Sequence, residues 1–189
     1  KDKKVDGYYG PLVDNFTLTS DAFRVAVEVA AGNSLFHVLV DTDATAAYFM
    51  KELDRRQSGR LTFLPLNRLR NLPIQYPDSN DVRPLMSIAL QYDTSVEEAI
   101  KQVFGYKLLA RDLEAAAHFS KEYKLDAITK EGDVVNRKGG FEGGYRDERS
   151  SKMAAVGAIR EASQSLKDLA DKEDALKKQA DQIDHQINE

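Results

Sequence analysis

The chain has 189 residues and a net charge of −4, and it contains no cysteine. This composition excludes disulfides, zinc–thiolate sites and a thiol nucleophile, and it argues against a dedicated binder of duplex DNA, which is usually basic. No apolar run is long enough to span a membrane, whereas an apolar share of 42% is enough for a packed core.

The chain begins at Lys1 within charged sequence and shows no signal peptide. We therefore expect a piece of a longer protein that has no membrane partner. Its length fits one domain with an extension, or two small domains. Residues 1–7 are mostly charged and should be frayed in isolation.

The first half of the chain predicts a β–α–β unit. Residues 35–40 are apolar enough for a buried strand, residues 44–55 predict an amphipathic helix, and residues 61–64 predict a second strand. Pro65 ends that strand. The alternative caps of the helix are Asp41, Thr42 and Asp43, and its apolar face consists of Ala46, Phe49, Met50 and Leu53.

The segments around this unit are less regular. Residues 23–29 alternate apolar and polar side chains and are either a strand or a short helix. Residues 66–83 contain two prolines and predict an irregular linker. Two overlapping capping boxes then predict a helix that ends at Gly105. The boxes pair Thr94 with Glu97 and Ser95 with Glu98, and the helix should bury Val96, Ala99, Ile100 and Val103.

The same order of elements recurs about 70 residues later. Residues 107–110 predict a strand, Asp112 caps a helix over residues 113–123, and residues 125–129 predict another strand. The recurrence indicates two related lobes. The residues expected to face inward from this helix are Leu113, Ala116 and Ala117.

A cluster of glycines follows the last of these strands. It consists of Gly139, Gly140, Gly143 and Gly144. Such a cluster indicates either an internal hairpin with turns of positive φ or an edge that lets another backbone come close, and the residues alone leave these alternatives equal. Phosphate binding is disfavoured, because a P-loop needs Lys and Ser or Thr after its last glycine and this chain has Tyr145 and Arg146.

From Ser150 onward the chain predicts one long helix with a heptad seam, interrupted only by Glu173. Such a seam must pair with another helix to be stable. That helix is expected before Lys1, in another chain, or in a part of the protein outside this sequence. The apolar seam positions are Ile159, Ala162, Leu166, Leu169, Leu176, Ala180, Ile183 and Ile187.

No residue pattern predicts a catalytic, metal or cofactor site. The histidines, His37, His118 and His185, are far apart and lack metal-ligand spacing. Two loops carry basic residues that are either solvated turns or candidate DNA contacts: Arg55, Arg56 and Arg60 in one, and Arg137 and Lys138 in the other. Two alternative functions stay open. They are an autonomous nucleic-acid-binding α/β module and a small α/β enzyme with a pocket near Asp41 or Asp133.

Several segments, taken in order, resemble the hinge domain of SMC (structural maintenance of chromosomes) proteins. They are LFHVLV followed by Asp41, GRLTFLPLNRL at residues 59–69, VFGYKLLARDLEAAA at residues 103–117 and AITKEGDVVNRKGGFEGGY at residues 127–145. Gly139, Gly143 and Gly144 match the family's glycine motif, whereas Gly140 stands where relatives often have another residue. Details such as NSLFHVLVDT, TFLPLNRL and GFEGGY look closest to the branch formed by the third SMC subunit of eukaryotic cohesin.

The resemblance implies a mixed α/β (α+β) fold. It consists of a two-lobed hinge with small mixed sheets flanked by helices, followed by a coiled-coil helix. Residues 1–80 would be lobe I, with residues 1–7 as the remnant of an incoming coil. Residues 81–149 would be lobe II, and residues 150–189 the start of the outgoing coiled-coil arm.

The resemblance also implies a non-catalytic dimerisation domain without cofactor or metal, because the family's ATPase heads lie at the far end of the arms. The expected partners are the hinge of the first SMC subunit of cohesin and the chain's own missing N-terminal coil helix, with DNA as a weak third. The expected setting is the chromosome in the nucleus, where the ring encloses sister DNAs. The expected interface residues are Thr129, Gly139, Phe141, Gly143, Gly144 and Tyr145.

Overall fold

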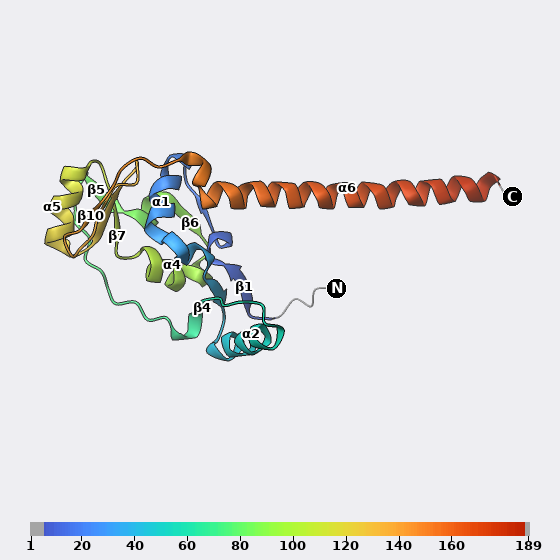
Figure 1. Ribbon diagram of the computed structural model, residues 1–189, viewed down its shortest axis with the longest axis horizontal. Coiled ribbons are helices and arrows are strands. Elements are labelled where there is room, and N and C mark those ends of the chain that lie inside the picture. The colour runs from blue at the N-terminus through green and yellow to red at the C-terminus, as the bar shows by residue number, and fades with distance from the viewer. Residues whose placement is uncertain (1–5, 188–189) are drawn as a thin grey trace. The chain divides into compact units, whose positions relative to one another are not determined.

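The computed structural model describes residues 6–187, apart from the side chains of residues 148, 181 and 184–187. It divides into two units, a body within Lys1–Arg146 and an arm within Asp147–Glu189 (Figure 1). The predicted coil remnant at residues 1–7 lies mostly outside the described residues, since only Asp6 and Gly7 are described and both form a turn. No helix among the described residues is long and apolar enough to cross a membrane.

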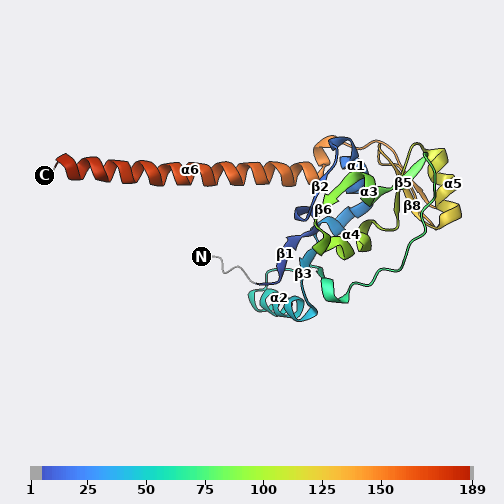
Figure 2. The same ribbon diagram turned by 180° about the vertical axis from the view of Figure 1, so that it is seen from behind.

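The first sheet of the body contains the predicted β–α–β unit. Its order is β1 (Tyr8–Pro11), β3 (Val38–Val40) and β4 (Phe63–Pro65). β3 and β4 are parallel, and α2 (Asp43–Arg56) connects them and lies beside the sheet (Figure 2). Of the alternative caps, Thr42 is the one that begins α2, because its hydroxyl accepts a hydrogen bond from the Thr45 N–H at 3.2 Å.

Two details of this unit differ from the sequence prediction. Met50 is 58% exposed, although it was expected to lie on the apolar face of α2 with Ala46, which is buried. A three-stranded sheet is too narrow to cover the whole stripe. The predicted strand at residues 35–40 is also shorter, because residues 32–36 form a 3-10 helix directly after α1 (Arg24–Ala31), with Gly32 at a φ of +53°.

The second sheet contains five strands in the order β10, β9, β8, β7, β5. β7 and β8 are parallel, and the other neighbours are antiparallel. β10 and β5 are therefore the outer strands. The bounds are Val82–Pro84 for β5, Lys107–Ala110 for β7, Asp126–Thr129 for β8, Val134–Val135 for β9 and Phe141–Glu142 for β10.

Helix α5 (Leu113–Tyr123) connects β7 with β8 and matches its predicted bounds. Asp112 caps it by accepting a hydrogen bond from the Ala115 N–H at 2.8 Å, as predicted. The inward face is set by Ala115, Ala116 and Ser120, which are buried. Leu113 is 43% exposed, so its predicted inward position is wrong. Its spacing places it on the same face as Ala116 and Ser120, but it is the first residue of the helix, where that buried face ends.

Elements from both halves of the chain pack together in the middle of the body. β2 (Phe16–Leu18) pairs with β6 (Leu90–Tyr92) in an antiparallel ribbon. Residues 23–29, for which the sequence predicts either a strand or a short helix, lie mostly in the helix α1 (Arg24–Ala31). This helix packs against α4 (Glu97–Phe104) and β8. The body is not divided at residue 80, since residues up to Arg146 form one compact unit. The predicted boundary between two lobes therefore stays a prediction.

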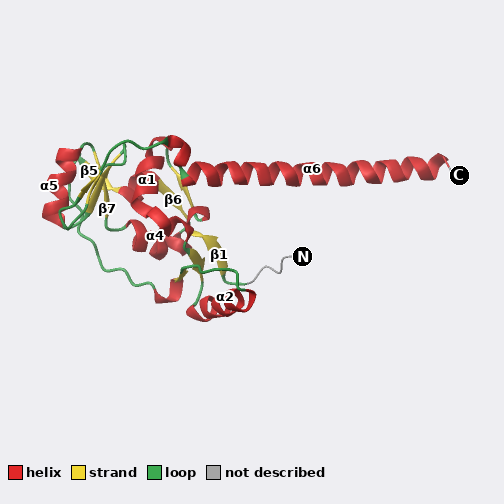
Figure 3. Ribbon diagram, viewed as in Figure 1, coloured by secondary structure: helices red, strands yellow, loops and turns green. Residues whose placement is uncertain are grey.

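The approach to α4 also differs from prediction. Neither predicted capping box forms. Asp93 caps instead, accepting a hydrogen bond from the Ser95 N–H at 2.8 Å, so that residues 94–96 form a 3-10 turn before the helix. The predicted linker at residues 66–83 begins with the 3-10 helix Leu66–Arg68, continues as a long loop and ends in β5 (Figure 3). One further short α-helix is α3 (Leu85–Ala89). The short 3-10 helices are Leu12–Asp14, Asp21–Phe23, Gly32–Phe36, Leu66–Arg68, Thr94–Val96 and Glu148–Ser150.

The arm is the single helix α6 (Lys152–Ile187), whose 36 residues reach about 54 Å. The predicted long helix is thus confirmed, and its large seam residues are 56% to 67% exposed. The alanines of the seam, Ala162 and Ala180, are exposed as well. The side chain of Ile187 lies outside the described residues. The exposed large residues are Ile159, Leu166, Leu169, Leu176 and Ile183.

We expect Asp112→Ala to lower the urea midpoint of unfolding, because the Ala115 N–H would lose its acceptor. Thr94→Ala is the matched control, since the predicted Thr94 cap is replaced by Asp93. Equal losses for the two variants in urea titrations would show that the structure assigns these caps wrongly.

Candidate functional site

Strand β10 is an open edge of the five-stranded sheet. It pairs on one side only, with Phe141 opposite Val135 and Glu142 opposite Val134. Phe141 is 64% exposed, and Tyr145, just beyond the strand, is 94% exposed. An outer strand with exposed aromatic side chains is a surface on which another chain can add a strand. We call residues 139–145 the β10 edge.

The turn that leads into β10 is shaped by Asn136. Its side-chain oxygen accepts hydrogen bonds from the N–H groups of Lys138, at 2.9 Å, and Gly140, at 3.1 Å. The Gly139 N–H donates to the Asn136 carbonyl at 2.8 Å, and Gly139 has a φ of +94°. Of the two alternatives for the glycine cluster, the internal hairpin is therefore present. The alternatives are compatible, because the hairpin still leaves β10 as an outer strand.

The glycines of the β10 edge have internal reasons to be glycine. A Cβ atom on Gly143 would lie 2.4 Å from the Asp133 carboxylate oxygen, and one on Gly140 would lie 2.6 Å from the Asn136 amide nitrogen. Gly144 has a φ of +127°, which a side chain would strain, and its N–H donates to Asp133 at 3.3 Å. The predicted role of these glycines in partner contact stays a prediction, because no partner chain is present.

Thr129 lies on the inside of this region. It is 3% exposed, and its hydroxyl accepts a hydrogen bond from the Asp133 N–H at 3.2 Å. Thr129 also pairs through its backbone with the Asp133 carbonyl at 2.9 Å. Its predicted membership of the interface is untested, and within this chain its contacts close the turn between β8 and β9.

Asp126 ties the β9–β10 turn to the centre of the sheet. Its carboxylate forms an ion pair with Lys107 at 2.6 Å and accepts a hydrogen bond from the Arg137 N–H at 2.9 Å. Burial raises the pKa of Asp126, but the hydrogen bonds from Arg137 and Lys107 outweigh it, so the pKa is lowered. The Arg137 guanidinium lies over the Tyr106 ring, 5.2 Å from its centre. Sequence analysis missed Asp126 and Asn136, although Asn in a glycine-rich turn is a recognisable signal.

The candidate DNA contacts of the two loops do not share one surface. Arg55 and Arg56, at the end of α2, both form ion pairs with Glu52, at 2.8 Å and 3.3 Å. Hydrogen bonding to Arg55 is the main cause of the lowered pKa of Glu52. Arg137 and Lys138 lie in the β9–β10 turn, far from α2 in both views of the body (Figures 1 and 2).

The carboxylates at the start of α2, Asp41 and Asp43, are bound within the fold. Asp41 accepts a hydrogen bond from the Thr42 N–H at 2.6 Å, and a hydrogen bond from Thr45 is the largest cause of its lowered pKa. Asp43 bonds to Asn67 and Arg68, which lower its pKa in that order. The described residues contain no group of three side chains suited to a metal ion. Asp41 is thus engaged in hydrogen bonds within the fold, and Asp43 also forms an ion pair with Arg68.

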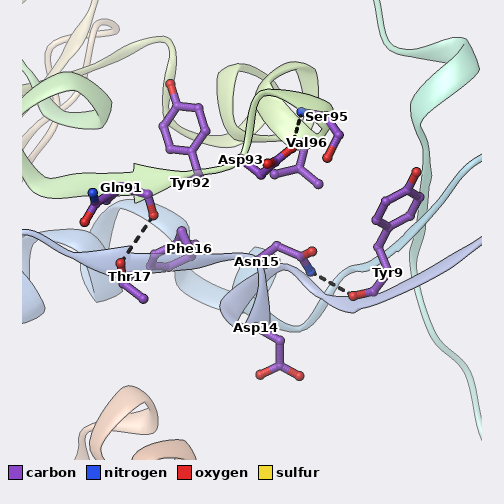
Figure 4. Close-up of a pocket in the computed structure, with 10 residues that line it drawn as sticks. All are labelled: Tyr9, Asp14, Asn15, Phe16, Thr17, Gln91, Tyr92, Asp93, Ser95 and Val96. Carbon is purple, nitrogen blue, oxygen red and sulfur yellow. Dashed lines mark hydrogen bonds between the residues drawn. The ribbon is translucent and has the colours of Figure 1, made fainter.

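A surface pocket beside the β2–β6 ribbon also lacks convergent chemistry (Figure 4). Asn15 donates to the Tyr9 carbonyl at 3.1 Å, and Thr17 donates to the Gln91 carbonyl at 3.5 Å. Asp93 accepts a hydrogen bond from the Ser95 N–H. Figure 4 shows the Asp14 carboxylate pointing away from Asp93. The polar groups seen here therefore serve the fold or face different directions.

Comparison with known proteins identifies one family. The model of the SMC proteins flexible hinge domain matches residues 5–120. This match covers more than half of the chain and ends before the β10 edge.

Two curated relatives align with most of the length of this chain. The chain is 47% identical over 156 residues to urease accessory protein 2 of Cryptococcus neoformans, covering 82% of this chain and 13% of that protein. It is 39% identical over 188 residues to structural maintenance of chromosomes protein 3 of Arabidopsis thaliana, covering 100% of this chain and 15% of that protein. The chain therefore spans only a small part of these relatives, and their names describe the whole proteins.

Two solved structures share the fold. A structure of the folded elbow of cohesin matches with a TM-score of 0.82 and 32% identity, over 99% of this chain and 27% of the other. The hinge domain of the Pyrococcus furiosus SMC protein matches with a TM-score of 0.66 and 31% identity, over 75% of each chain. The mixed α/β fold with a long following helix agrees with the expectation from sequence.

We expect Gly143→Ala to destabilise the body by about 1 kcal/mol, because the new methyl group would displace the Asp133 carboxylate from the Gly144 N–H. The same change should cost far less in an Asp133→Ala background. A double-mutant cycle of urea unfolding measures this coupling, and additive effects would contradict the steric reason for Gly143.

The arm generates a second prediction. Because its seam is exposed, the amides of residues 166–183 should exchange rapidly with solvent when the protein is a verified monomer. Hydrogen exchange followed by mass spectrometry measures this, with the buried strands β7 and β8 as the protected reference. Strong protection of the arm in a monomer would contradict the idea that its helix needs a mate.

Proposed function

We propose that this chain pairs with the hinge of the first SMC subunit of cohesin. The proposal starts from the family, because the chain belongs to the SMC flexible hinge domains. Hinges are the dimerisation domains of SMC proteins, and this chain is similar to structural maintenance of chromosomes protein 3 from several organisms. The likeness to cohesin supports the choice of partner. The family match also confirms the prediction that these residues form a non-catalytic domain rather than an ATPase head.

The observation that carries this proposal is the β10 edge. Phe141 and Tyr145 expose large aromatic surfaces beside an unpaired strand edge. Burying such surface at the centre of an interface is the usual source of strong binding. We propose that the β10 edge, from Gly139 to Tyr145, docks onto lobe I of the partner hinge.

The lobe I sheet offers a matching surface. β1 is an outer strand and presents Tyr8, which is 49% exposed, and Tyr9, which is 41% exposed. The Tyr8 ring contacts Phe49 of α2, with 5.6 Å between ring centres. In a two-lobed pair, each hinge would supply one β10 edge and one β1 surface, so two contacts would close the joint.

The exposed seam of α6 supports a second partner, the chain's own N-terminal coil helix, running antiparallel to α6. In this arrangement the hinge would join two arms whose far ends carry the ATPase heads. The whole protein would then act at chromosomes in the nucleus, closing a ring around sister DNAs. The name of one relative, chromosome segregation protein sudA of Emericella nidulans, agrees with this setting.

DNA remains a weak third partner in this proposal. Because Arg55 and Arg56 are paired with Glu52, the remaining adjacent cations among the candidate contacts are Arg137 and Lys138 in the β9–β10 turn. Two cations provide only a small electrostatic contribution to phosphate binding. An autonomous nucleic-acid-binding function is therefore less supported than hinge pairing.

We expect the double variant Phe141→Ala with Tyr145→Ala to bind the partner hinge at least about tenfold more weakly, because its exposed anchors are lost. Isothermal titration calorimetry with the purified partner hinge measures the affinity. These residues separate docking from folding better than the glycines do, since Gly143 and Gly144 also shape the chain.

Leu113→Ala is the matched control, because Leu113 is also exposed in the same half of the body but lies on α5. It should leave the affinity unchanged, and both variants should keep the thermal midpoint of the unmodified chain. An unchanged affinity of the double variant would overturn the β10 edge as the docking surface.

A further inference from the structure

A cationic pocket lies between the C-terminal end of α5 and the β9–β10 turn. We call it the lysine pocket. An apolar wall of Ala117, Val135 and Phe141 completes it, so one of its walls belongs to the β10 edge. Its basic side chains are Lys121, Lys124, Arg137 and Lys138.

The lysines of this pocket lack acidic partners. Among the described side chains, no carboxylate forms an ion pair with Lys121, Lys124 or Lys138. Most other cations of the body are paired in this acidic chain, namely Arg24, Arg55, Arg56, Arg68, Lys101, Lys107, Arg111 and Arg146. The lysine pocket beside β10 therefore carries positive charge that no carboxylate in the described part of the chain neutralises.

The backbone of the pocket is poorly suited to phosphate. Phosphate sites usually use free N–H groups at a helix N-terminus or in a glycine loop. Here the N–H groups of Lys138 and Gly140 already donate to Asn136, and that of Arg137 donates to Asp126. The helix end at the pocket is the C-terminal end of α5, whose partial negative charge disfavours a multiply charged anion. The flexible tips of the lysines are the groups left to bind a ligand.

We propose that the lysine pocket receives aspartate or glutamate side chains from an acidic segment of the partner hinge. This inference rests on the proposed function, because the segment arrives when the partner docks on the β10 edge. Phe141 is common to the edge and to the pocket wall, so a chain that covers Phe141 passes the mouth of the pocket. The charge complementarity would guide the approach of the partner and select it over hinges without acidic residues there.

The test is the triple variant Lys121→Gln, Lys124→Gln, Lys138→Gln in the complete 189-residue chain. Calorimetry with the partner hinge at low and high salt should show binding about tenfold weaker at low salt. The dependence of the affinity on salt should also become shallower, because fewer charge pairs form. Glutamine is only slightly shorter than lysine and has a similar helix propensity, so the fold should be retained.

The matched control removes three exposed cations elsewhere, with Lys51→Gln, Arg60→Gln and Arg83→Gln. It changes the net charge equally and should leave both affinity and salt dependence nearly unchanged. Carbodiimide crosslinking of the unmodified complex provides a direct readout, since it joins lysines to contacting carboxylates. Crosslinks from Lys121, Lys124 or Lys138 to partner aspartates or glutamates are expected.

Several outcomes would overturn the inference. Equal losses of affinity in the two triple variants would show that only the net charge matters. An absence of crosslinks from the pocket lysines would show that partner carboxylates do not contact them. Loss of oligonucleotide binding with unchanged hinge affinity would assign the pocket to nucleic acid. Lysine-dependent self-association of the chain alone would assign it to a second copy.

The same measurements separate this inference from the proposed function. If the hinges bind and the Phe141 and Tyr145 variant fails to bind while the lysine variant binds normally, the pairing stands and the pocket assignment falls. If the unmodified chain does not bind the partner hinge at all, both are wrong.

Discussion

Strand β10 depends on side chains that hold it from one side only. With two residues paired to β9, it has too few ladder bonds to keep its shape alone. Asn136 closes the turn before it, and Asp133 holds the Gly144 N–H after it. Asp126 fixes the Arg137 N–H to the middle of the sheet. These polar contacts leave the opposite margin and the Phe141 ring free for another chain.

This constraint also explains the glycine cluster in physical terms. A backbone that bends so closely around the side chains of Asn136 and Asp133 has no room for Cβ atoms at Gly140 and Gly143. Gly144 is needed for a different reason, its positive φ. These glycines are therefore required first for the β10 edge to fold, whether or not a partner then contacts it.

Local chemistry made much of the fold predictable. The Asp112 cap, the bounds of α5 and the β–α–β order depend on neighbouring residues, and they appear as expected. The heptad pattern likewise identified α6 and its exposed seam. The exposure of Met50 and Leu113 was not predictable, because it depends on how far each sheet extends beneath its helix. The choice of Asp93 over Thr94 as a cap depends on where β6 ends.

The candidate site was predicted less completely. Phe141 and Tyr145 are exposed at an open edge, and their expected place in an interface stays a prediction. Thr129 is buried, which was not predicted, because burial depends on how distant strands pack together. The two groups of basic residues lie apart in the fold, as they do in the sequence. The roles of Asp126 and the unpaired state of the lysines emerge only when strands from different parts of the chain lie together.

The brevity of β10 has a consequence for a copy that has not yet met its counterpart. Long, flat, apolar margins template fibrils, since each added molecule extends the same ladder. Two residues followed by Gly143 and Gly144 provide too little ladder for such growth. The short strand therefore limits fibril growth from β10 while its outer edge is uncovered.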